Sequence, residues 1–330
     1  MSTSASARQV LALCGGIGGA KLALGLYRVL DAGRLTVVVN TGDDFEHLGL
    51  HISPDLDTVL YTLAGLADPD RGWGRAQETW QFMESLRQVR GETWFQLGDR
   101  DLAMHILRTQ WLRAGKNLPT FAAHVAGQFA IDARILPMSD AAVRTMVDTA
   151  EGELPFQHYF VRRRCEPVVR AIRFAGAKEA EPSAGLLPLI NNPSLHGIVI
   201  CPSNPYLSVD PILAVPGIAA ALATSSAPVI AVSPIIGGQA VKGPTAKIMN
   251  ELGIAVTTES IAAHYRGLID GLVIDEADAA DRGRVDLPVL VTRTMMRDIA
   301  DRERLADDVI AFANTLRHQP ATKRIGGGRR

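Results

Sequence analysis

Four aspartates lie within fifteen positions near the start of the chain: Asp43, Asp44, Asp55 and Asp57. Carboxylate oxygens are the ligands that a hard divalent cation such as Mg²⁺ prefers. Helix capping and ordinary solvated charge account for two of the four, because Asp55 falls in the first turn of a helix that Ser53 and Pro54 are predicted to open. A metal site and a purely structural group therefore both stay open at this point.

A glycine-rich loop precedes these aspartates. The segment 10–21 is an apolar run followed by four glycines, and an amphipathic stretch continues to Leu30; the glycines are Gly15, Gly16, Gly18 and Gly19. This order predicts a strand, a tight loop and a helix whose free N–H groups favour an anion such as phosphate. The spacing matches neither the Walker motif nor a complete dinucleotide fingerprint, since Lys21 stands at the third glycine position. The loop thus predicts a phosphate site, with a turn kept only for close strand–helix packing as the alternative.

Three further apolar runs end in polar turns. Residues 35–39 are followed by Asn40-Thr41-Gly42-Asp43-Asp44, residues 197–201 by Pro202-Ser203-Asn204-Pro205, and residues 229–232 by Ser233-Pro234-Ile235-Ile236-Gly237-Gly238. Continuous apolar runs are typical of buried parallel strands, and open α/β sheets bind ligands at the carboxyl ends of such strands. We therefore expect these turns to lie beside the glycine loop at one edge of a sheet.

A later helix carries another candidate group. Leu97-Gly98-Asp99-Arg100-Asp101 opens a segment with apolar residues at helical spacing as far as Leu112, and Asp99 is predicted to be its N-cap. Asp101, His105 and Arg108 follow at i, i+4 and i+7 and form a polar stripe. Such a stripe is either a solvated helix face or part of a site.

Strand and helix patterns alternate on both sides of a less regular central region. This predicts an α/β fold: a Rossmann-like, mostly parallel sheet flanked by helices, with an additional mainly helical subdomain. We expect the Rossmann-like core to comprise residues 9–67 and 170–318, the helical subdomain residues 68–169, and a disordered tail residues 319–330.

The composition excludes several classes of protein. The chain has 330 residues, of which 47% are hydrophobic, and a formal net charge of -1. That content supports a large core, and the lack of a basic excess argues against a nucleic-acid partner. The three cysteines have no metal-binding spacing and fit reduced thiols, and no apolar run reaches membrane-spanning length. We therefore expect a cytoplasmic protein with no membrane partner.

Seven segments, taken in this order, resemble a known family: GGIGGAK, VVNTGDD, SPDLDTVLYTLAG, LGDRDLAMHILR, ILPMSD, PSNPYLSVDPIL and SPIIGGQAVKGPTAK. The set is similar to that of the 2-phospho-L-lactate transferase family of coenzyme F420 biosynthesis, from Leu11 to about Thr292. No single motif carries the match. The resemblance implies a Rossmann-like core with an additional helical region, in a homodimer.

The resemblance also implies an activity. The donor is guanosine diphosphate (GDP) esterified through its outer phosphate to a hydroxyacid: 2-phospho-L-lactate or a related phosphoenolpyruvate or phosphoglycerate group. The acceptor is the deazaflavin 7,8-didemethyl-8-hydroxy-5-deazariboflavin, called Fo. The terminal ribityl hydroxyl of Fo attacks the phosphorus that bears the acid, GMP leaves, and coenzyme F420-0 or an analogue forms. Family members use Mg²⁺, and a separate glutamate ligase acts downstream.

Matched residues take roles from the same resemblance. Asp57 is the ligand nearest the acceptor hydroxyl and assists its deprotonation, while Asp99 and Arg100 face the acceptor or the transferred phosphate. Arg100 and His105 join Asp57 in binding the acceptor. The pool of metal ligands is Asp43, Asp44, Asp55 and Asp57. The residues expected to bind the nucleotide and the donor are Gly15, Gly16, Gly18, Gly19, Lys21, Asn40, His47, Ser203, Asn204, Pro205, Ser233 and Gly237.

One position departs from the family pattern. Many relatives have an aromatic residue after the acidic pair, and Phe45-Glu46-His47 stands in that place here. The candidate donors differ by one hydroxyl, one double bond or one carbon substituent, so a single hydrogen bond or clash discriminates them. We expect His47 to help set that choice.

Two other functions stay open on the residues alone. The glycine loop suggests a dinucleotide-binding oxidoreductase, although the second strand ends in Asn-Thr-Gly-Asp-Asp rather than in an isolated ribose-binding acid. A nucleotide-binding regulatory protein of a related glycine-loop family is the alternative without catalysis. The GDRD and SPDLD segments favour the transferase.

Overall fold

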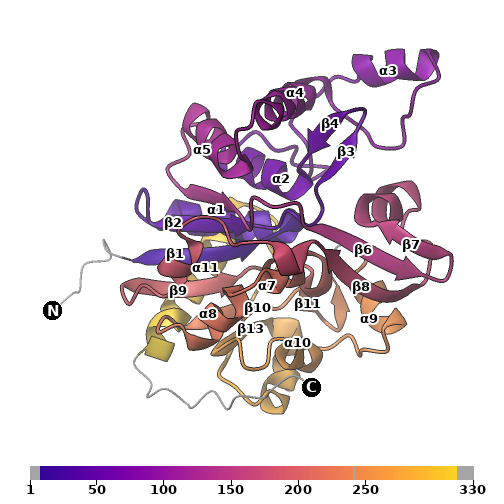
Figure 1. Cartoon of the computed structure of the whole chain (residues 1–330). Helices are drawn as coiled ribbons and strands as arrows, with labels where there is room; N and C mark the ends of the chain where they lie inside the picture. The colour runs from indigo at the N-terminus through magenta and orange to yellow at the C-terminus, as the bar shows by residue number, and fades with distance from the viewer. Residues whose placement is uncertain (1–7, 241–242, 318–330) are drawn as a thin grey trace.

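A computed structural model describes residues 8–240 and 243–317 of the chain (Figure 1). Its centre is a seven-stranded sheet in the order β14-β13-β10-β9-β1-β2-β5, in which every neighbouring pair is parallel. The strands are β1 (Gln9–Cys14), β2 (Leu35–Val39), β5 (Arg134–Pro137), β9 (Leu195–Ile200), β10 (Val229–Val232), β13 (Gly271–Asp275) and β14 (Val289–Thr292). The expected Rossmann-like sheet is confirmed, and the predicted tail at 319–330 lies outside the described residues.

Alternate residues of the central strands enter two different hydrophobic cores. Leu11 and Leu13 of β1 belong to one core, whereas Val10, Ala12 and Cys14 belong to the other. Because both faces of the sheet are covered, a central strand needs apolar side chains at every position. This requirement explains the continuous apolar runs in the sequence.

Helices cover both faces of the sheet. One face packs against α1 (Gly16–Val29), α2 (Pro54–Leu63), α5 (Leu118–Gln128) and α11 (Ile299–Arg317). The other packs against α6 (Leu186–Ile190), α7 (Asp210–Ala214), α8 (Ile218–Thr224), α9 (Thr245–Glu251) and α10 (Thr258–His264). Within the described ranges no single helix has both the length and the apolar character needed to cross a membrane, although the bent pair Pro205–Ala214 and Ile218–Thr224 meets these criteria when taken together.

The segment 68–169 is less helical than the sequence predicts. It contains α3 (Gln81–Gln88), α4 (Asp99–Arg113) and α5, but β5 joins the main sheet, and β6 (Arg144–Thr149) and β7 (Gly152–Pro155) form an antiparallel sheet with β8 (Val169–Ala175). Burial alternates along β6 with a period of two residues, as is typical of a strand. Thr145, Val147 and Thr149 are buried, while the residues between them are not. The helical description therefore holds for residues 81–128, and the division of the chain into domains stays a prediction.

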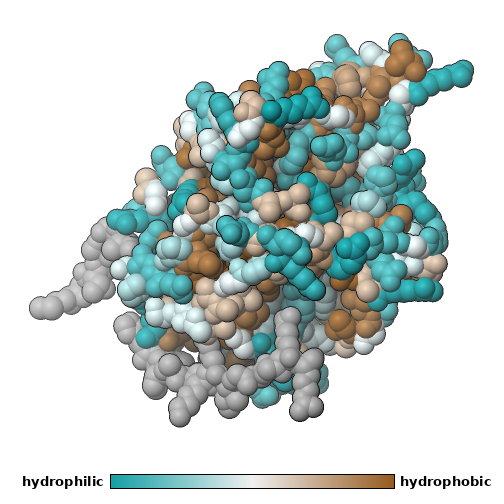
Figure 2. Space-filling view, viewed as in Figure 1, coloured by the Kyte–Doolittle hydropathy of each residue, from teal (hydrophilic) through white to brown (hydrophobic). Residues whose placement is uncertain are grey.

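Smaller elements complete the chain. Two hairpins are formed by β3 (Phe45–His47) with β4 (Leu50–Ile52) and by β11 (Ile235–Ile236) with β12 (Gln239–Ala240). The short helical turns are His158–Arg162, Ala177–Glu179, Pro205–Val209 and Glu276–Arg284. Helix α3 projects from the rest of the molecule in Figure 1, and Figure 2 shows hydrophobic residues among hydrophilic ones at that end. Phe82 and Val89 are exposed there.

We expect Gly25→Ala to disrupt the close packing of α1 against α11. A Cβ at this position of α1 would overlap the carbonyl oxygen of Arg302 in α11. The overlap should lower the free energy of unfolding by about 1–3 kcal/mol, as measured by urea denaturation. The control is Gly127→Ala in α5, where no atom lies within 4 Å of the new Cβ and helix propensity should add up to about 1 kcal/mol. Equal stability of Gly25→Ala and wild type would contradict this packing.

Candidate active site

A cavity of about 580 Å³ opens where the strands end. Its wall includes Gly15–Gly18 after β1, Asp43 after β2, Pro202–Asn204 after β9, and Ser233 and Pro234 after β10. These four strands are neighbours in the sheet and run parallel, so their carboxyl ends meet at one edge. The structure thus brings together the four turns that the sequence analysis expects at one edge.

The glycine loop is shaped first by close packing. Gly16 has φ +63°, which favours glycine, and a Cβ at Gly18 would lie 2.5 Å from the carbonyl oxygen of Pro202. The Gly15 N–H donates to Ser203 Oγ (3.3 Å) and the Gly16 N–H donates to Asp55 Oδ1 (2.7 Å). The first amides of α1 have no partner within the helix, as at any helix start. The loop therefore offers a ligand the amides after Gly16, while its first two bind within the protein.

Asp55 holds this loop to two other segments. Its Oδ2 accepts a hydrogen bond from Asn40 Nδ2 (2.9 Å), and Asn40 Oδ1 accepts one from the Gly42 N–H (2.8 Å). Asn40 Nδ2 also lies 3.3 Å from the Leu207 carbonyl oxygen, to which it donates. Burial raises the pKa of Asp55 to about 6 against the opposing effect of these hydrogen bonds. Asp55 and Asn40 are thus engaged within the fold, and Asp55 also borders the cavity.

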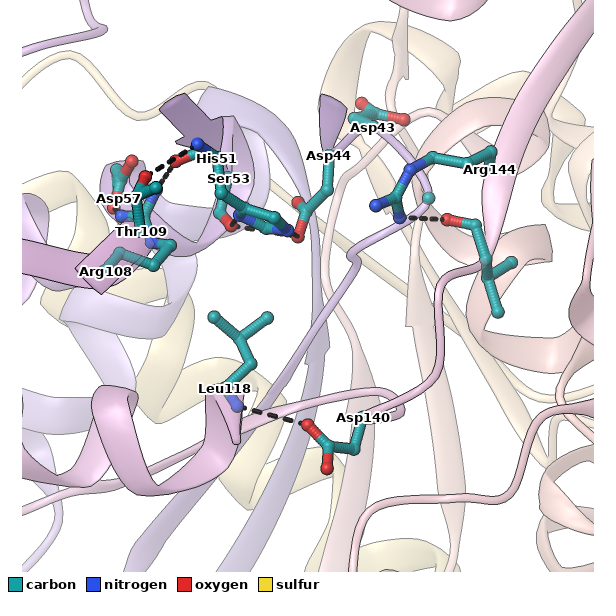
Figure 3. Close-up of polar contacts among 12 residues, drawn as sticks. Asp43, Asp44, His51, Ser53, Asp57, Arg108, Thr109, Leu118, Asp140 and Arg144 are labelled. Atoms are coloured by element: carbon teal, nitrogen blue, oxygen red, sulfur yellow. Dashed lines mark hydrogen bonds and ion pairs between the residues drawn. The ribbon is translucent and has the colours of Figure 1, made fainter. Parts of the chain in front are cut away.

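Asp43 and Asp44 are buried with incomplete pairing. The Oδ1 atom of each has no hydrogen-bond partner among the described residues. Burial, followed by the charge of Asp55, raises the pKa of Asp43 well above its ordinary value. Burial raises the pKa of Asp44 to about 7, although Arg144 and Arg108 oppose the shift. Asp43 borders the cavity, and Figure 3 shows Asp44 beside Ser53 and His51.

Ser53 differs from its predicted role. It occupies the N-cap position of α2, but its side chain makes no capping hydrogen bond. The Ser53 hydroxyl instead donates to Asp44 Oδ2 (2.9 Å), as Figure 3 shows. A buried carboxylate has a stronger need for a donor than a helix end that Pro54 opens, because proline removes one of the orphan N–H groups.

In the stripe, His105 and Arg108 are buried against α2 and β4 and Asp101 is half-buried, so this is not a solvated face. Arg108 Nη2 binds Asp57 Oδ1, and Arg108 Nη1 donates to the His51 carbonyl oxygen (3.2 Å). His105 lies between two carboxylates, with Nδ1 3.6 Å from Asp57 Oδ2 and Nε2 3.2 Å from Asp101 Oδ2. The ligand atoms of Asp57, Asp101 and His105 all lie within 4.8 Å of one another, so this group could hold a metal ion.

Asp99 and Arg100 lie apart from the cavity wall. Asp99 accepts hydrogen bonds from the N–H groups of Gln81 (3.1 Å) and Phe82 (3.0 Å), so it caps α3 and not α4. Helix α4 begins after Gly98, and its first turn is capped by the side chain of Glu78. The Glu78 carboxylate accepts hydrogen bonds from the N–H groups of Arg100 (2.7 Å) and Asp101 (2.8 Å). The Arg100 side chain is exposed and donates to Gln77 Oε1 (3.3 Å). The sequence predicted Asp99 as the N-cap of its own helix. In the structure Asp99 caps α3, and Glu78, which precedes α3, caps α4.

The remaining donor-site candidates divide into two groups. Those at the cavity wall include Lys21, whose Nζ donates to the Met296 carbonyl oxygen (3.0 Å), and Ser203, which donates to the Gly15 carbonyl oxygen (2.8 Å). Candidates with contacts inside the fold include His47, which packs against Phe45, Trp94 and Phe95, and Gly237, whose N–H donates to Asp278. Gly19, Pro205 and Asn40 also fall outside the wall, while Asn204 and Ser233 belong to it.

Sequence reasoning missed a large part of the wall. It includes the loop residues Arg71 and Trp73, Thr294–Met296 after β14, and the aromatic residues Phe95, Phe156 and Phe160. The position of Thr294–Met296 after an apolar run was a usable signal, because the ends of parallel strands share an edge. The aromatic residues come from segments outside the regular alternation and carried no such signal. Together with Tyr61 they add aromatic rings to the cavity wall, and the rings of Phe156 and Phe160 are stacked.

We expect Asp44→Asn to stabilise the metal-free protein in a pH-dependent way. An acid with a raised folded pKa is favoured in its neutral form, so the wild type loses stability as pH rises from the ordinary value of 3.8 to about 7. Asparagine removes this loss and keeps an acceptor for Ser53. With a chelator present, the gain in unfolding free energy should be larger at about pH 8 than at about pH 5, by about 1–3 kcal/mol. Asp31→Asn in an exposed loop is the control, and an equal gain at both pH values would contradict the shift.

Comparisons with known proteins match this architecture. The family model described as 2-phospho-L-lactate transferase CofD matches residues 10–311. A phosphoenolpyruvate transferase of Streptomyces griseus is 39% identical over 318 residues, covering 94% of this chain and 99% of that protein. One of Nocardia farcinica is 36% identical over 304 residues, covering 87% and 91%.

A solved structure shows the same fold. The crystal structure of a protein from Bacillus halodurans has a TM-score of 0.62 with 16% identity and covers 92% of this chain and 99% of its own. A second structure of a Bacillus halodurans protein, with a TM-score of 0.58, is described as a member of the UPF0052 family. The family match over most of the length and the identity to the two transferases lead to one conclusion: the chain belongs to the 2-phospho-L-lactate transferase CofD family.

Proposed function

We propose that this chain moves a phospho-hydroxyacid from a GDP-activated donor to the ribityl hydroxyl of Fo, releasing GMP and forming coenzyme F420-0 or an analogue. The observation that carries the proposal is the meeting of the glycine loop and buried carboxylates at one cavity. Membership of the family supports a phosphotransferase of this kind. Relatives named phosphoenolpyruvate transferases make phosphoenolpyruvate the first acid group to test.

The start of α1 supports binding of the donor's diphosphate. The N–H groups of Gly15 and Gly16 already bind Ser203 and Asp55, so we assign the phosphate oxygens to the amides of Ile17 and Gly18 in the first turn. Both residues border the cavity. Orphan amides and the positive end of the helix dipole favour an anion there.

Mg²⁺ fits the carboxylates beside this loop. Carboxylates outnumber lysine and arginine among the described wall residues, because Asp43, Asp55, Asp57 and Asp101 face only Lys21 and Arg71. An anionic donor therefore needs a further cation, and Asp43 offers a buried oxygen without a partner among the described residues. We assign Asp43 to Mg²⁺, with Asp44 and Asp55 contributing negative charge nearby. Bound Mg²⁺ supplies charge neutralisation at the phosphate oxygens.

Asp57 supports attack by the acceptor. Asp57 borders the cavity, and its Oδ2 is 3.6 Å from His105 Nδ1 and has no hydrogen-bond partner among the described residues, so we assign this oxygen to take the proton of the attacking hydroxyl. The ribityl oxygen bonds to the acid-bearing phosphorus, the bond from that phosphorus to the bridging oxygen breaks, and GMP leaves with that oxygen. The aromatic wall formed by Trp73, Phe95 and Phe160 suits the flat deazaflavin ring.

Several roles rest on the resemblance alone and stay predictions. Arg100 and Asp99 as acceptor or phosphate contacts belong here, and so does His47 as the residue that chooses the acid. The same holds for a homodimer, a cytoplasmic location and a separate glutamate ligase downstream.

The proposed reaction predicts a product of defined mass. Purified protein, Fo and Mg²⁺ are incubated with each of the three GDP-activated acids, and mass spectrometry is used to detect the phosphodiester and GMP. We expect one acid to be transferred at least about 10-fold faster than the others, since one polar contact discriminates by that order. No phosphodiester from any of the three donors would refute the assignment, and tight binding of GDP without turnover would favour the regulatory protein.

Asp43→Asn should impair chemistry and Mg²⁺ use together. Removing this carboxylate takes away the open ligand, so we expect turnover to fall about 100-fold or more and the Mg²⁺ concentration for half-maximal rate to rise. Asp31→Asn, which alters an exposed loop, should leave both unchanged. A variant with unaltered Mg²⁺ dependence would move the metal away from Asp43.

A further inference from the structure

Arg108 is a large side chain enclosed completely by the protein, with a relative exposure of 0%. It lies on α4, and its guanidinium reaches α2 and the strand β4, as Figure 3 shows for Asp57 and His51. Its carbon Cζ also lies 5.2 Å from the ring centre of Phe121 on α5. One buried cation therefore touches three separate segments and does not border the cavity itself.

The contact with Asp57 divides the two oxygens of that carboxylate. Oδ1 binds Arg108 Nη2, whereas Oδ2 has no hydrogen-bond partner among the described residues and lies 3.6 Å from His105 Nδ1. Asp57 and His105 border the cavity. The guanidinium therefore holds one oxygen of the carboxylate and leaves the other without a hydrogen-bond partner among the described residues.

A second chain of contacts holds His105. Asp101 Oδ2 lies 3.2 Å from His105 Nε2, and Asp101 Oδ1 accepts a hydrogen bond from the Tyr61 hydroxyl (2.6 Å). The imidazole is thereby fixed with Nδ1 toward Asp57 and Arg108, and Arg108 Nη1 lies 3.4 Å from that nitrogen. The Asp57 carboxylate is thus held between Arg108, which binds Oδ1, and His105, whose Nδ1 lies beside Oδ2.

A contribution to folding stability does not explain why the Arg108–Asp57 ion pair is buried. Removing two charges from water is costly, and a buried ion pair contributes little compared with an apolar pair of the same volume. Arg108 Nε also has no partner among the described residues. An ion pair that is costly to bury, and that leaves one oxygen of a cavity-lining residue without a hydrogen-bond partner among the described residues, fits a site that needs a fixed hydrogen-bond acceptor.

We propose that Arg108 is a positioning residue that holds Asp57 by Oδ1 and turns Oδ2 toward the acceptor hydroxyl. This inference rests on the proposed function, in which Asp57 takes the hydroxyl proton. It also separates two kinds of carboxylate in the cavity, because a guanidinium already stands beside Asp57 whereas Asp43 has no such partner among the described residues. The proposed function accordingly assigns the divalent cation to Asp43 and the acceptor hydroxyl to Asp57.

The test is a double-mutant comparison of turnover. Arg108→Met should lower kcat about 100-fold, with the KM for Fo changed less than about threefold, because the acceptor still binds but meets a misdirected carboxylate. Arg108→Lys should recover part of this loss, about 10-fold, since it keeps the charge but not the fork. In an Asp57→Asn background, Arg108→Met should cost less than about threefold more, because the residue acts through Asp57.

Arg113→Met is the matched control. Arg113 ends the same helix, is exposed, and donates to the Gly49 carbonyl oxygen (2.8 Å), so its loss tests a structural arginine of α4. We expect kcat within about twofold of wild type. The proposal is overturned if Arg108→Met keeps wild-type kcat, or if it lowers kcat by the same factor in the wild-type background and in the Asp57→Asn background.

A crystal structure of the variant separates this inference from the proposed function. In Arg108→Met, or in Arg108→Lys if the methionine variant does not fold, the Asp57 side chain should adopt a different rotamer from the one it has beside Arg108. An unchanged Asp57 rotamer overturns the positioning role whether or not the protein makes the phosphodiester. If the wild type makes no phosphodiester from any donor, the proposed function fails, and the crystal structure still decides what Arg108 does to Asp57.

Discussion

The two hydrogen bonds that Asp55 accepts are the constraint on which the site depends. One comes from the glycine loop after β1 and the other from Asn40 after β2, while Asp55 itself stands in the first turn of α2. Three segments that are separate in the sequence are thereby fixed around one carboxylate. A buried carboxylate needs such donors, and a loop with φ +63° at Gly16 needs an anchor. The hydrogen bonds of Asp55 therefore stabilise its own buried charge and also fix the backbone conformation of the glycine loop.

The acids around the cavity are stabilised in two different ways. Asp57 has a buried guanidinium beside it, and Asp55 has an amide and a backbone N–H, so both are held inside the fold by donors of the protein. Asp43 and Asp44 each keep one buried oxygen without a partner in the described ranges. Carboxyl groups in this state favour protonation or a bound cation. In the proposed function the two kinds of acid take different roles, Asp43 at the metal ion and Asp57 at the attacking hydroxyl.

The sequence predicted the features that depend on local pattern. The strand at 35–39 and the strand at 229–232 follow from apolar runs, and the meeting of four turns follows from parallel topology. What it could not predict depends on partners far along the chain. His105 and Arg108 are buried because α2 and the hairpin that precedes it cover α4. Asp99 caps α3, and Glu78 takes the place at the start of α4 that the sequence assigned to Asp99. No local periodicity encodes such exchanges.

The exchange of caps between α3 and α4 links the opening of two helix ends. Asp99, at the start of α4, accepts from amides of α3, while Glu78, just before α3, accepts from amides of α4. Fraying of either helix start removes an acceptor from the other, so the two ends open as one cooperative unit and their amide protons share one protection against hydrogen exchange. The projecting helix α3 is thereby coupled to the segment that carries Asp101 and His105. The first turn of α4, which carries Asp101 of the cavity wall, is therefore held by an acceptor from the segment that precedes α3.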